Sequence, residues 1–275
     1  MLARETRVRR GPVPRELAGT AVGEDDDRLE GDCFLLRARA GISLFYQRGH
    51  GVTVEHPDDT DPRDVALLLH GVLYSAIAAI NGLMPLHASA VAHAGRVYAF
   101  TGAPGAGKST LAAGLGREGF PLFCDDTLLL DISGADIVCL PGHKRLKLWP
   151  EGVALARATA REHVASHYPK HFAHPVAGLV DEPLPLAELL FLEAGNHPAL
   201  LPVAPGERLA RLQDDHYTAR LFAKAGGLSR AERFKQLAAI ARRMPMRRFA
   251  RPFDPAAFDR GLAFIADHIR SGDSA

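Results

Sequence analysis

The chain has 275 residues, of which 47% are hydrophobic and 24% are charged. These fractions are typical of a globular protein with a buried core, and they exclude a disordered or collagen-like chain. Lys and Arg together number 33 and Asp and Glu 32. The net charge of +1 gives no overall attraction to nucleic acid or to a membrane surface, so any charged site must be local.

The cysteines and the N-terminus indicate the compartment. Cys33, Cys124 and Cys139 lie in apolar runs, and their small, odd number argues against a disulfide framework. No apolar run approaches the ~20 residues that span a bilayer, and the charged N-terminus lacks the apolar stretch of a signal peptide. We therefore expect a cytoplasmic protein with reduced thiols and no membrane partner.

The first 83 residues are expected to hold an arm and a small β/α segment. Residues 1–30 carry few apolar residues and predict a mobile N-terminal arm. Residues 31–83 are expected to form a small N-terminal segment that contains an antiparallel meander. The expected strands of the meander are 33–36, 42–46 and 52–55.

A helix is predicted to follow the meander, over residues 62–80. Asp61 is a good N-cap, and Pro62 suits the first helical position. Apolar residues recur at helical spacing until Gly82, which ends the pattern.

Residues 84–275 are expected to form the catalytic domain. Strands are predicted at 86–92, 96–100, 121–124, 127–132, 137–140 and 189–192. A short helix is expected over 109–117, and residues 150–180 predict a mixture of helix and loop. Ser229 and Glu232 form a capping box for a helix to about 243, and Asp254-Pro255 caps a last helix.

A glycine-rich loop carries the chemistry. It lies between an apolar strand and a short helix, and it matches the pattern G-x-x-x-x-G-K-[ST] of a P-loop. In such a loop the backbone N–H groups surround phosphate oxygens, and the new helix points its positive end at the same anion. Lys108 would reach the β- and γ-phosphates, and the Ser109 hydroxyl would bind Mg²⁺. The expected nucleotide-binding residues are Gly102, Ala103, Pro104, Gly105, Ala106, Gly107, Lys108, Ser109 and Thr110.

An acidic doublet, Asp125-Asp126, ends the apolar strand that follows the P-loop helix. Adjacent carboxylates after a buried strand repel each other unless a cation or a proton-transfer role compensates. In P-loop proteins an acidic residue at a strand end holds Mg²⁺, so we predict a functional doublet; the alternative is a solvated acidic turn. His87 lies near another apolar strand, where a structural histidine is the more common case.

Together these segments resemble the catalytic domain of HPr kinase/phosphorylase, and more closely its shorter relatives, the HPr-kinase-like proteins. Some of those relatives are tailoring kinases for ribosomal peptides, including lasso peptides. The resemblance covers about residues 83–195. It is carried by Leu86-His87-Ala88-Ser89-Ala90-Val91, Val97–Phe100, the P-loop and Leu122-Phe123-Cys124-Asp125-Asp126.

The resemblance implies an α/β fold of the phosphoenolpyruvate-carboxykinase-like P-loop type, a mixed sheet with flanking helices. It implies transfer of the ATP γ-phosphate to a serine hydroxyl, with ATP and Mg²⁺ as cofactors. Asp125 would take the hydroxyl proton, Asp126 would assist Ser109 in binding Mg²⁺, and His87 would lie near the transferred phosphate. The second family signature, Glu-x-Arg-Gly, is absent; in its place stands the segment 140–150, which looks like the shorter relatives.

Cations outside the loop are candidates for stabilising the transferred phosphoryl group. His143, Lys144, Arg145 and Lys147 follow a predicted strand; Arg145 and Lys147 are the first choices and Lys170 is a further one. A solvated basic loop is the alternative.

Two further patterns leave alternatives open. His163, His167 and His171 have helical i, i+4 spacing, but Pro169 interrupts the helix and no further ligand completes a metal site. Residues 230–251 hold eight Arg or Lys and one acid. A solvated face is the leading interpretation of this segment; the others are a face for an acidic peptide or phosphates, and a nucleic-acid helix, for which aromatic residues are few.

We therefore predict an ATP- and Mg²⁺-dependent kinase that phosphorylates a serine on a peptide or small protein. The alternatives are a small-molecule hydroxyl kinase of the same fold and a nucleotide-sensing regulatory ATPase. The acceptor and the oligomeric state are left open, because contacts to the acceptor lie on loops and fold does not fix substrate.

Overall fold

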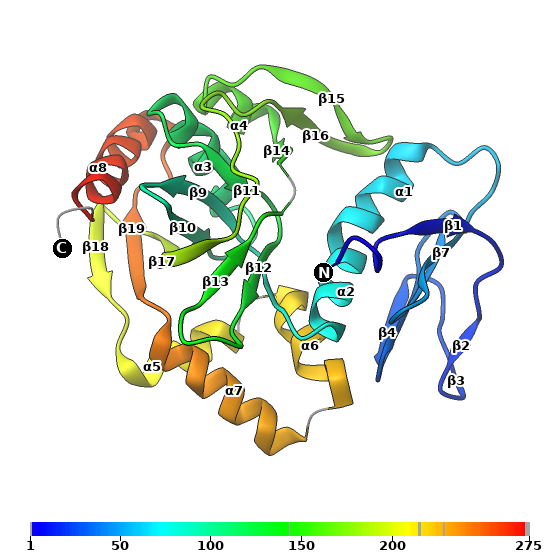
Figure 1. The fold of residues 1–275 in the computed structure, drawn as a ribbon. Coiled ribbons are helices and arrows are strands. Elements are labelled where there is room, and N and C mark those ends of the chain that lie inside the picture. The colour runs from blue at the N-terminus through cyan, green and yellow to red at the C-terminus, as the bar shows by residue number, and fades with distance from the viewer. Residues whose placement is uncertain (1, 143, 214–215, 228, 273–275) are drawn as a thin grey trace. The chain divides into compact units, whose positions relative to one another are not determined.

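The structure is a computed structural model that describes residues 2–142, 144–213, 216–227 and 229–272. The chain forms two compact units (Figure 1). Unit 1 is Met1–Pro85 with His216–Gln236, and unit 2 is Leu86–Asp215 with Leu237–Ala275. The fold is mixed α/β with several sheets, in line with the α/β class that the resemblance implied.

Unit 1 contains a five-stranded sheet in the order β1-β7-β6-β5-β4. The sheet is antiparallel except for β1, which pairs parallel with β7. The strands of this unit are β1 (Val8–Arg10), β2 (Glu16–Leu17), β3 (Thr20–Ala21), β4 (Asp26–Glu30), β5 (Cys33–Arg37), β6 (Ser43–Gln47) and β7 (Gly51–Glu55). The predicted meander is confirmed as β5 to β7.

The helices of unit 1 pack against that sheet. The predicted helix over 62–80 is confirmed as three consecutive pieces: α1 (Pro62–Leu68), the π-helical η1 (Leu69–Leu73) and α2 (Tyr74–Ile80). Asp61 caps its start by accepting a hydrogen bond from the Arg63 N–H at 2.8 Å. Later elements of this unit are α6 (His216–Lys224), η2 (Ala225–Gly227) and the beginning of α7 (Arg230–Arg243).

The structure differs from two expectations about domain limits. Residues 1–30 were expected to form a mobile arm, but β1 and β4 form the two edges of the five-stranded sheet. Scattered apolar residues suffice there because an edge strand has only one neighbour and needs little burial. The expected catalytic domain, 84–275, excludes residues 216–236, which belong to unit 1.

One helix among the described residues, Pro62–Ile80, is long and apolar enough to cross a membrane, with 19 residues and a mean hydropathy of 1.4. Half of its most apolar stretch is buried inside the protein. Core helices pass the same test, so this finding is weak evidence for a span.

Unit 2 is built on a mixed sheet in the order β11-β9-β10-β17-β13-β12, with β19 pairing β17 and β18 pairing β19. Its strands are β9 (Ser89–His93), β10 (Arg96–Thr101), β11 (Leu122–Cys124), β12 (Leu128–Asp131), β13 (Val138–Leu140), β17 (Leu184–Ala194), β18 (Ala199–Pro202) and β19 (Met246–Arg251). The strand predicted at 86–92 is divided between β8 (Met84–Leu86) and β9.

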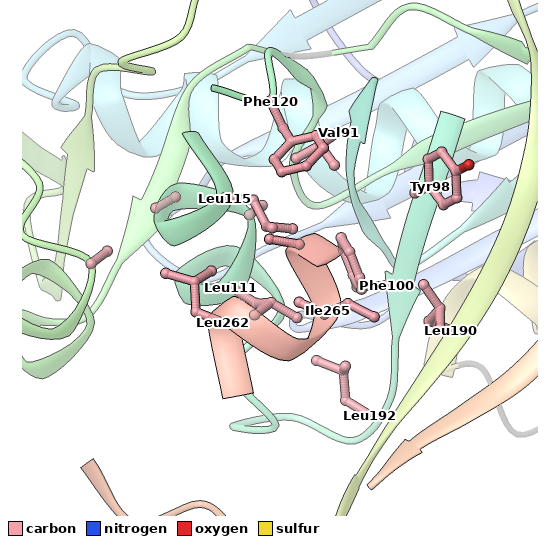
Figure 2. Close-up of a cluster of buried hydrophobic side chains, with 14 of the residues drawn as sticks. Val91, Tyr98, Phe100, Leu111, Leu115, Phe120, Leu190, Leu192, Leu262 and Ile265 are labelled. Atoms are coloured by element: carbon pink, nitrogen blue, oxygen red, sulfur yellow. The ribbon is translucent and has the colours of Figure 1, made fainter. Parts of the chain in front are cut away.

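Helices α3 (Lys108–Arg117) and α8 (Phe258–Ser271) share the main core of unit 2 (Figure 2). Leu111, Leu115, Leu262 and Ile265 are fully buried there against residues of the sheet. The helices approach closely at Gly114, where a Cβ would lie 3.0 Å from the Phe258 ring. This packing fixes the position of α3, and therefore of the loop that precedes it.

A separate three-stranded sheet, β14-β16-β15, lies in the region expected to mix helix and loop. Its strands are β14 (Leu146–Leu148), β15 (Ala160–Ala165) and β16 (Tyr168–Ala173), and the short helix α4 (Pro150–Leu155) connects β14 to β15. The remaining helices are α5 (Pro205–Gln213) and η3 (Pro255–Ala257). The capping box of α7 is confirmed by reciprocal hydrogen bonds between Ser229 and Glu232.

Candidate functional site

The candidate site lies where the parallel strands of unit 2 end. β10 runs parallel to β17, and β17 runs parallel to β19. β11 and β10 both pair antiparallel with β9, so they too run in the same direction. The carboxyl ends of these strands therefore meet at one edge of the sheet, which is where open α/β sheets bind their ligands. The P-loop follows β10 and the acidic doublet follows β11.

The P-loop backbone adopts conformations that need glycine. Gly102, Gly105 and Gly107 have φ angles of +146°, +81° and +85°. A Cβ on Gly102 would lie 2.9 Å from the Leu192 carbonyl oxygen of the neighbouring strand β17. Only glycine fits such positions without strain.

Lys108 and Ser109 begin α3, as predicted. The Lys108 ammonium is buried and donates to the carbonyl oxygens of Gly102 and Ala103, at 2.9 and 3.3 Å. The Lys108 side chain is therefore folded back onto the backbone of the P-loop. Thr110 packs toward α4, because its hydroxyl oxygen lies 2.8 Å from where a Cβ on Gly152 would stand.

Asp125 is buried with two hydrogen-bond donors at its carboxylate. The Ser89 hydroxyl donates to it at 2.6 Å and the Lys147 N–H at 2.9 Å. Burial and the neighbouring Asp126 charge raise the pKa of Asp125, while Ser89, the Lys147 N–H and the nearby Ser109 act to lower it. Ser109 of the P-loop helix therefore lies close enough to the doublet to affect its ionisation.

Asp126 is half-buried, and three cationic groups surround it. Its carboxylate lies 2.8 Å from the Lys147 ammonium and 3.8 Å from Nδ1 of His87. Burial alone would raise the pKa of Asp126, but the charges of Lys147, His87 and Lys170 lower it below the usual value. Asp126 therefore stays ionised at neutral pH, and the structure brings His87 and Lys147 to the doublet.

The other members of the basic segment lie elsewhere. Arg145 is exposed, forms an ion pair with Glu162 and stacks 3.6 Å from the Phe172 ring centroid. Lys144 donates to the carbonyl oxygens of Phe123 and Val180, and burial lowers the pKa of its ammonium, so it stabilises the structure. His143 lies outside the described residues.

The residues present fit a nucleoside triphosphate and Mg²⁺. The hydroxyl of Ser109 and the carboxylates of the doublet are oxygen donors, which are the ligands that Mg²⁺ prefers. Lys108 already holds two carbonyl oxygens, and phosphate oxygens would replace these partners. The glycine-dependent loop leads directly into the N-terminus of α3, where the helix end favours an anion.

Two residues of the site escaped the sequence analysis as functional candidates. Ser89 lies in the motif around His87 and was assigned no role from the sequence. In the structure its hydroxyl donates a hydrogen bond to Asp125. Arg251 ends β19 and was counted only among the cations of residues 230–251. Its guanidinium is buried, donates to the Ala106 carbonyl of the P-loop at 3.0 Å and forms no ion pair among the described residues. No local pattern singled out Arg251, because its strand, Met246–Arg251, holds three arginines.

The remaining patterns do not form sites. His163 and His171 lie on paired strands, with ring centroids 4.1 Å apart, and not on a helix. No group of three metal-ligating side chains occurs in the part of the chain that the structure describes. Most cations of residues 230–251 are exposed, in keeping with a solvated segment, whereas Arg251 is buried.

Comparisons with known proteins give only a distant likeness. No protein-family model matches the chain, and no curated protein matches it. Among solved structures, the HPr(Ser) kinase/phosphatase from Coxiella burnetii is similar over 69% of this chain and 99% of that one, with 12% identity and a TM-score of 0.37. A likeness of this size does not establish a shared activity, so the chemistry must be argued from the residues of this chain.

Proposed function

We propose that the protein is an ATP- and Mg²⁺-dependent kinase that transfers the γ-phosphate to a serine hydroxyl of a peptide or small protein. The observation that carries this proposal is the position of the acidic doublet, which follows β11 at the same edge of the sheet as the P-loop after β10, with Asp125 buried. A phosphate-binding loop beside a buried carboxylate of raised pKa suits proton removal from a hydroxyl.

Each residue has an expected task in this reaction. The P-loop N–H groups and Lys108 would orient the triphosphate, and bound Mg²⁺ would neutralise charge on its oxygens. Asp125 would accept the proton of the attacking hydroxyl, since a raised pKa makes a carboxylate a better base near neutral pH. Asp126 stays ionised and would assist Ser109 in holding the ion, while Lys147 and His87 lie beside it for the transferred group.

The test is phosphate transfer from labelled ATP to serine-containing peptides, with nucleotide affinity measured separately. We expect Asp125→Asn to keep nucleotide affinity and to slow transfer by about 10²- to 10⁴-fold, the usual contribution of a general base. Lys108→Ala should weaken nucleotide binding as well. Full transfer by the Asp125→Asn protein would refute the assigned role.

The same assay separates the alternatives. Transfer to small hydroxyl compounds but to no peptide would indicate a small-molecule kinase. Slow release of inorganic phosphate with no phosphorylated acceptor would indicate a nucleotide-sensing ATPase. All three outcomes use the same phosphate-binding part of the site. The geometry around Asp125 is compatible with each of them in that part alone.

A further inference from the structure

The outer face of the strands β14 and β16 is an unassigned surface beside the doublet. Side chains alternate between the two faces of a strand, and β14 pairs antiparallel with β16, with Lys147 opposite Phe172. Lys147 contacts Asp126, so the face that carries Lys147 is the one that borders the candidate site.

Part of the opposite face packs on the core. Leu146, Leu148 and Ala173 are buried in the hydrophobic cluster that also contains α3. This packing fixes the orientation of both strands. The side chains between these residues are therefore directed away from the core.

The outer face carries aromatic rings and cations in contact with each other. Trp149 and Tyr168 have ring centroids 5.7 Å apart, and the Lys170 ammonium lies 5.5 and 5.6 Å from their centroids. The Arg145 guanidinium stacks on Phe172. We call this set, Arg145, Lys147, Trp149, Tyr168, Lys170 and Phe172, the aromatic–cationic face.

One cation of this face has no ion-pair partner. Arg145 is paired with Glu162 and Lys147 with Asp126. Among the residues that the structure describes, Lys170 forms no ion pair; its ammonium packs on the two rings, and its charge helps to lower the pKa of Asp126. Trp149 is 44% exposed, which leaves a large aromatic surface open to a ligand beside this ammonium group.

We propose that the aromatic–cationic face binds the acceptor as an acidic peptide segment in extended conformation, with carboxylates close to the hydroxyl that is phosphorylated. This inference rests on the proposed function for the position of that hydroxyl. Carboxylates would bind Lys170 and, nearer the doublet, compete for Lys147. The peptide backbone and its apolar side chains would lie on the rings of Trp149 and Tyr168.

The length of the face favours a peptide over a small molecule. Tyr168 and Lys170 lie beside Trp149, and Phe172 stands opposite Lys147. Tyr168 and Phe172 are four positions apart on β16, a separation that extends over ~13 Å at the rise of a β-strand. A row of this length matches several residues of an extended chain. It exceeds what a single sugar or metabolite would cover.

The protein contains a single tryptophan, Trp149, so its fluorescence reports directly on this face. The experiment titrates the full chain with a short peptide that has a serine among glutamates and with a matched peptide that has lysines in their place. We expect a saturable change in fluorescence with the acidic peptide only, weakened by added salt. Lys170→Met should weaken this binding about tenfold, the usual value of a hydrogen bond to a charged group.

Arg260→Met is the matched control, because Arg260 is an exposed cation of unit 2 on α8; we expect it to bind the acidic peptide like the parent protein. Equal responses to both peptides, no response to either, or equal affinities of the parent and Lys170→Met proteins would overturn the inference. A response to Mg-ATP in place of the peptide would show that the rings hold the nucleotide, and would also overturn it.

The readout separates this inference from the proposed function, because it needs no phosphate transfer. Binding of the acidic peptide without transfer would support the surface and refute the kinase. Transfer to acidic and basic peptides at equal rates would support the kinase and refute the surface.

Discussion

Replacing Asp125 with asparagine should stabilise the protein while it slows transfer. The carboxylate is 1% exposed and lies beside the charge of Asp126, so the ionised form is held at a cost in folding free energy. Asparagine has the same shape and no charge. Its oxygen would accept from the Lys147 N–H, and its NH₂ group would donate to the oxygen of Ser89, because a hydroxyl accepts as well as donates.

The expected gain is about 1 kcal/mol, within the range found when a functional residue is removed from its strained setting. For a domain of this size it corresponds to a rise in Tm of about 3 °C. The assay is thermal unfolding followed by circular dichroism, with Asp136→Asn as the control, since Asp136 is exposed.

The pH dependence gives the sharper test. The pKa of Asp125 is raised in the folded protein, so the folded state binds this proton more tightly than the unfolded state. The resulting stability is present below the ordinary aspartate value of ~3.9 and is lost as pH rises through the raised pKa. The advantage of Asp125→Asn should therefore be small near pH 4 and full near pH 8. An equal advantage at both values, or a lower Tm at pH 8, would refute the reasoning.

Two further variants test the P-loop. Gly102→Ala should lower Tm by several degrees and weaken nucleotide binding, because φ is +146° and the new Cβ would lie 2.9 Å from the Leu192 oxygen. The control is Gly134→Ala, where the nearest atom is 3.9 Å from the new Cβ. Equal Tm values for the two variants would contradict the argument. Arg251→Met should weaken nucleotide binding about tenfold in calorimetry, because it removes the guanidinium from the Ala106 carbonyl, and unchanged affinity would exclude Arg251 from the site.

The parts of the site that are close in sequence could be predicted from it. β10, the P-loop, α3 and the doublet after β11 follow one another within thirty-odd residues, and each is signalled by local glycine, charge and apolar patterns. Arg251 could not be placed in this way. It reaches Ala106 only because β19 pairs with β17 and β17 with β10, and strand order is not written in local patterns.

The histidine spacing shows a second limit. His163, His167 and His171 fit a helix by spacing, but the segment forms the hairpin β15–β16. Pro169 has no N–H for the ladder, and the register shifts between the pairs His163–His171 and Ala165–Tyr168. That irregularity hides the alternation of a strand, so periodicity alone gave no strand signal. Lys147 shows the same limit. Its place in the sequence predicted a cation near the transferred phosphate, whereas in the structure its ammonium forms an ion pair with Asp126.

The backbone conformation at Asp126 restricts which residues can replace it. Its φ of +75° lies in the left-handed region, which only glycine, asparagine and aspartate enter readily. Asn or Gly at this position would remove the charge and keep the turn, whereas a β-branched residue would destabilise the fold. Substitutions at position 126 therefore separate the effect of the carboxylate charge from the effect of the turn.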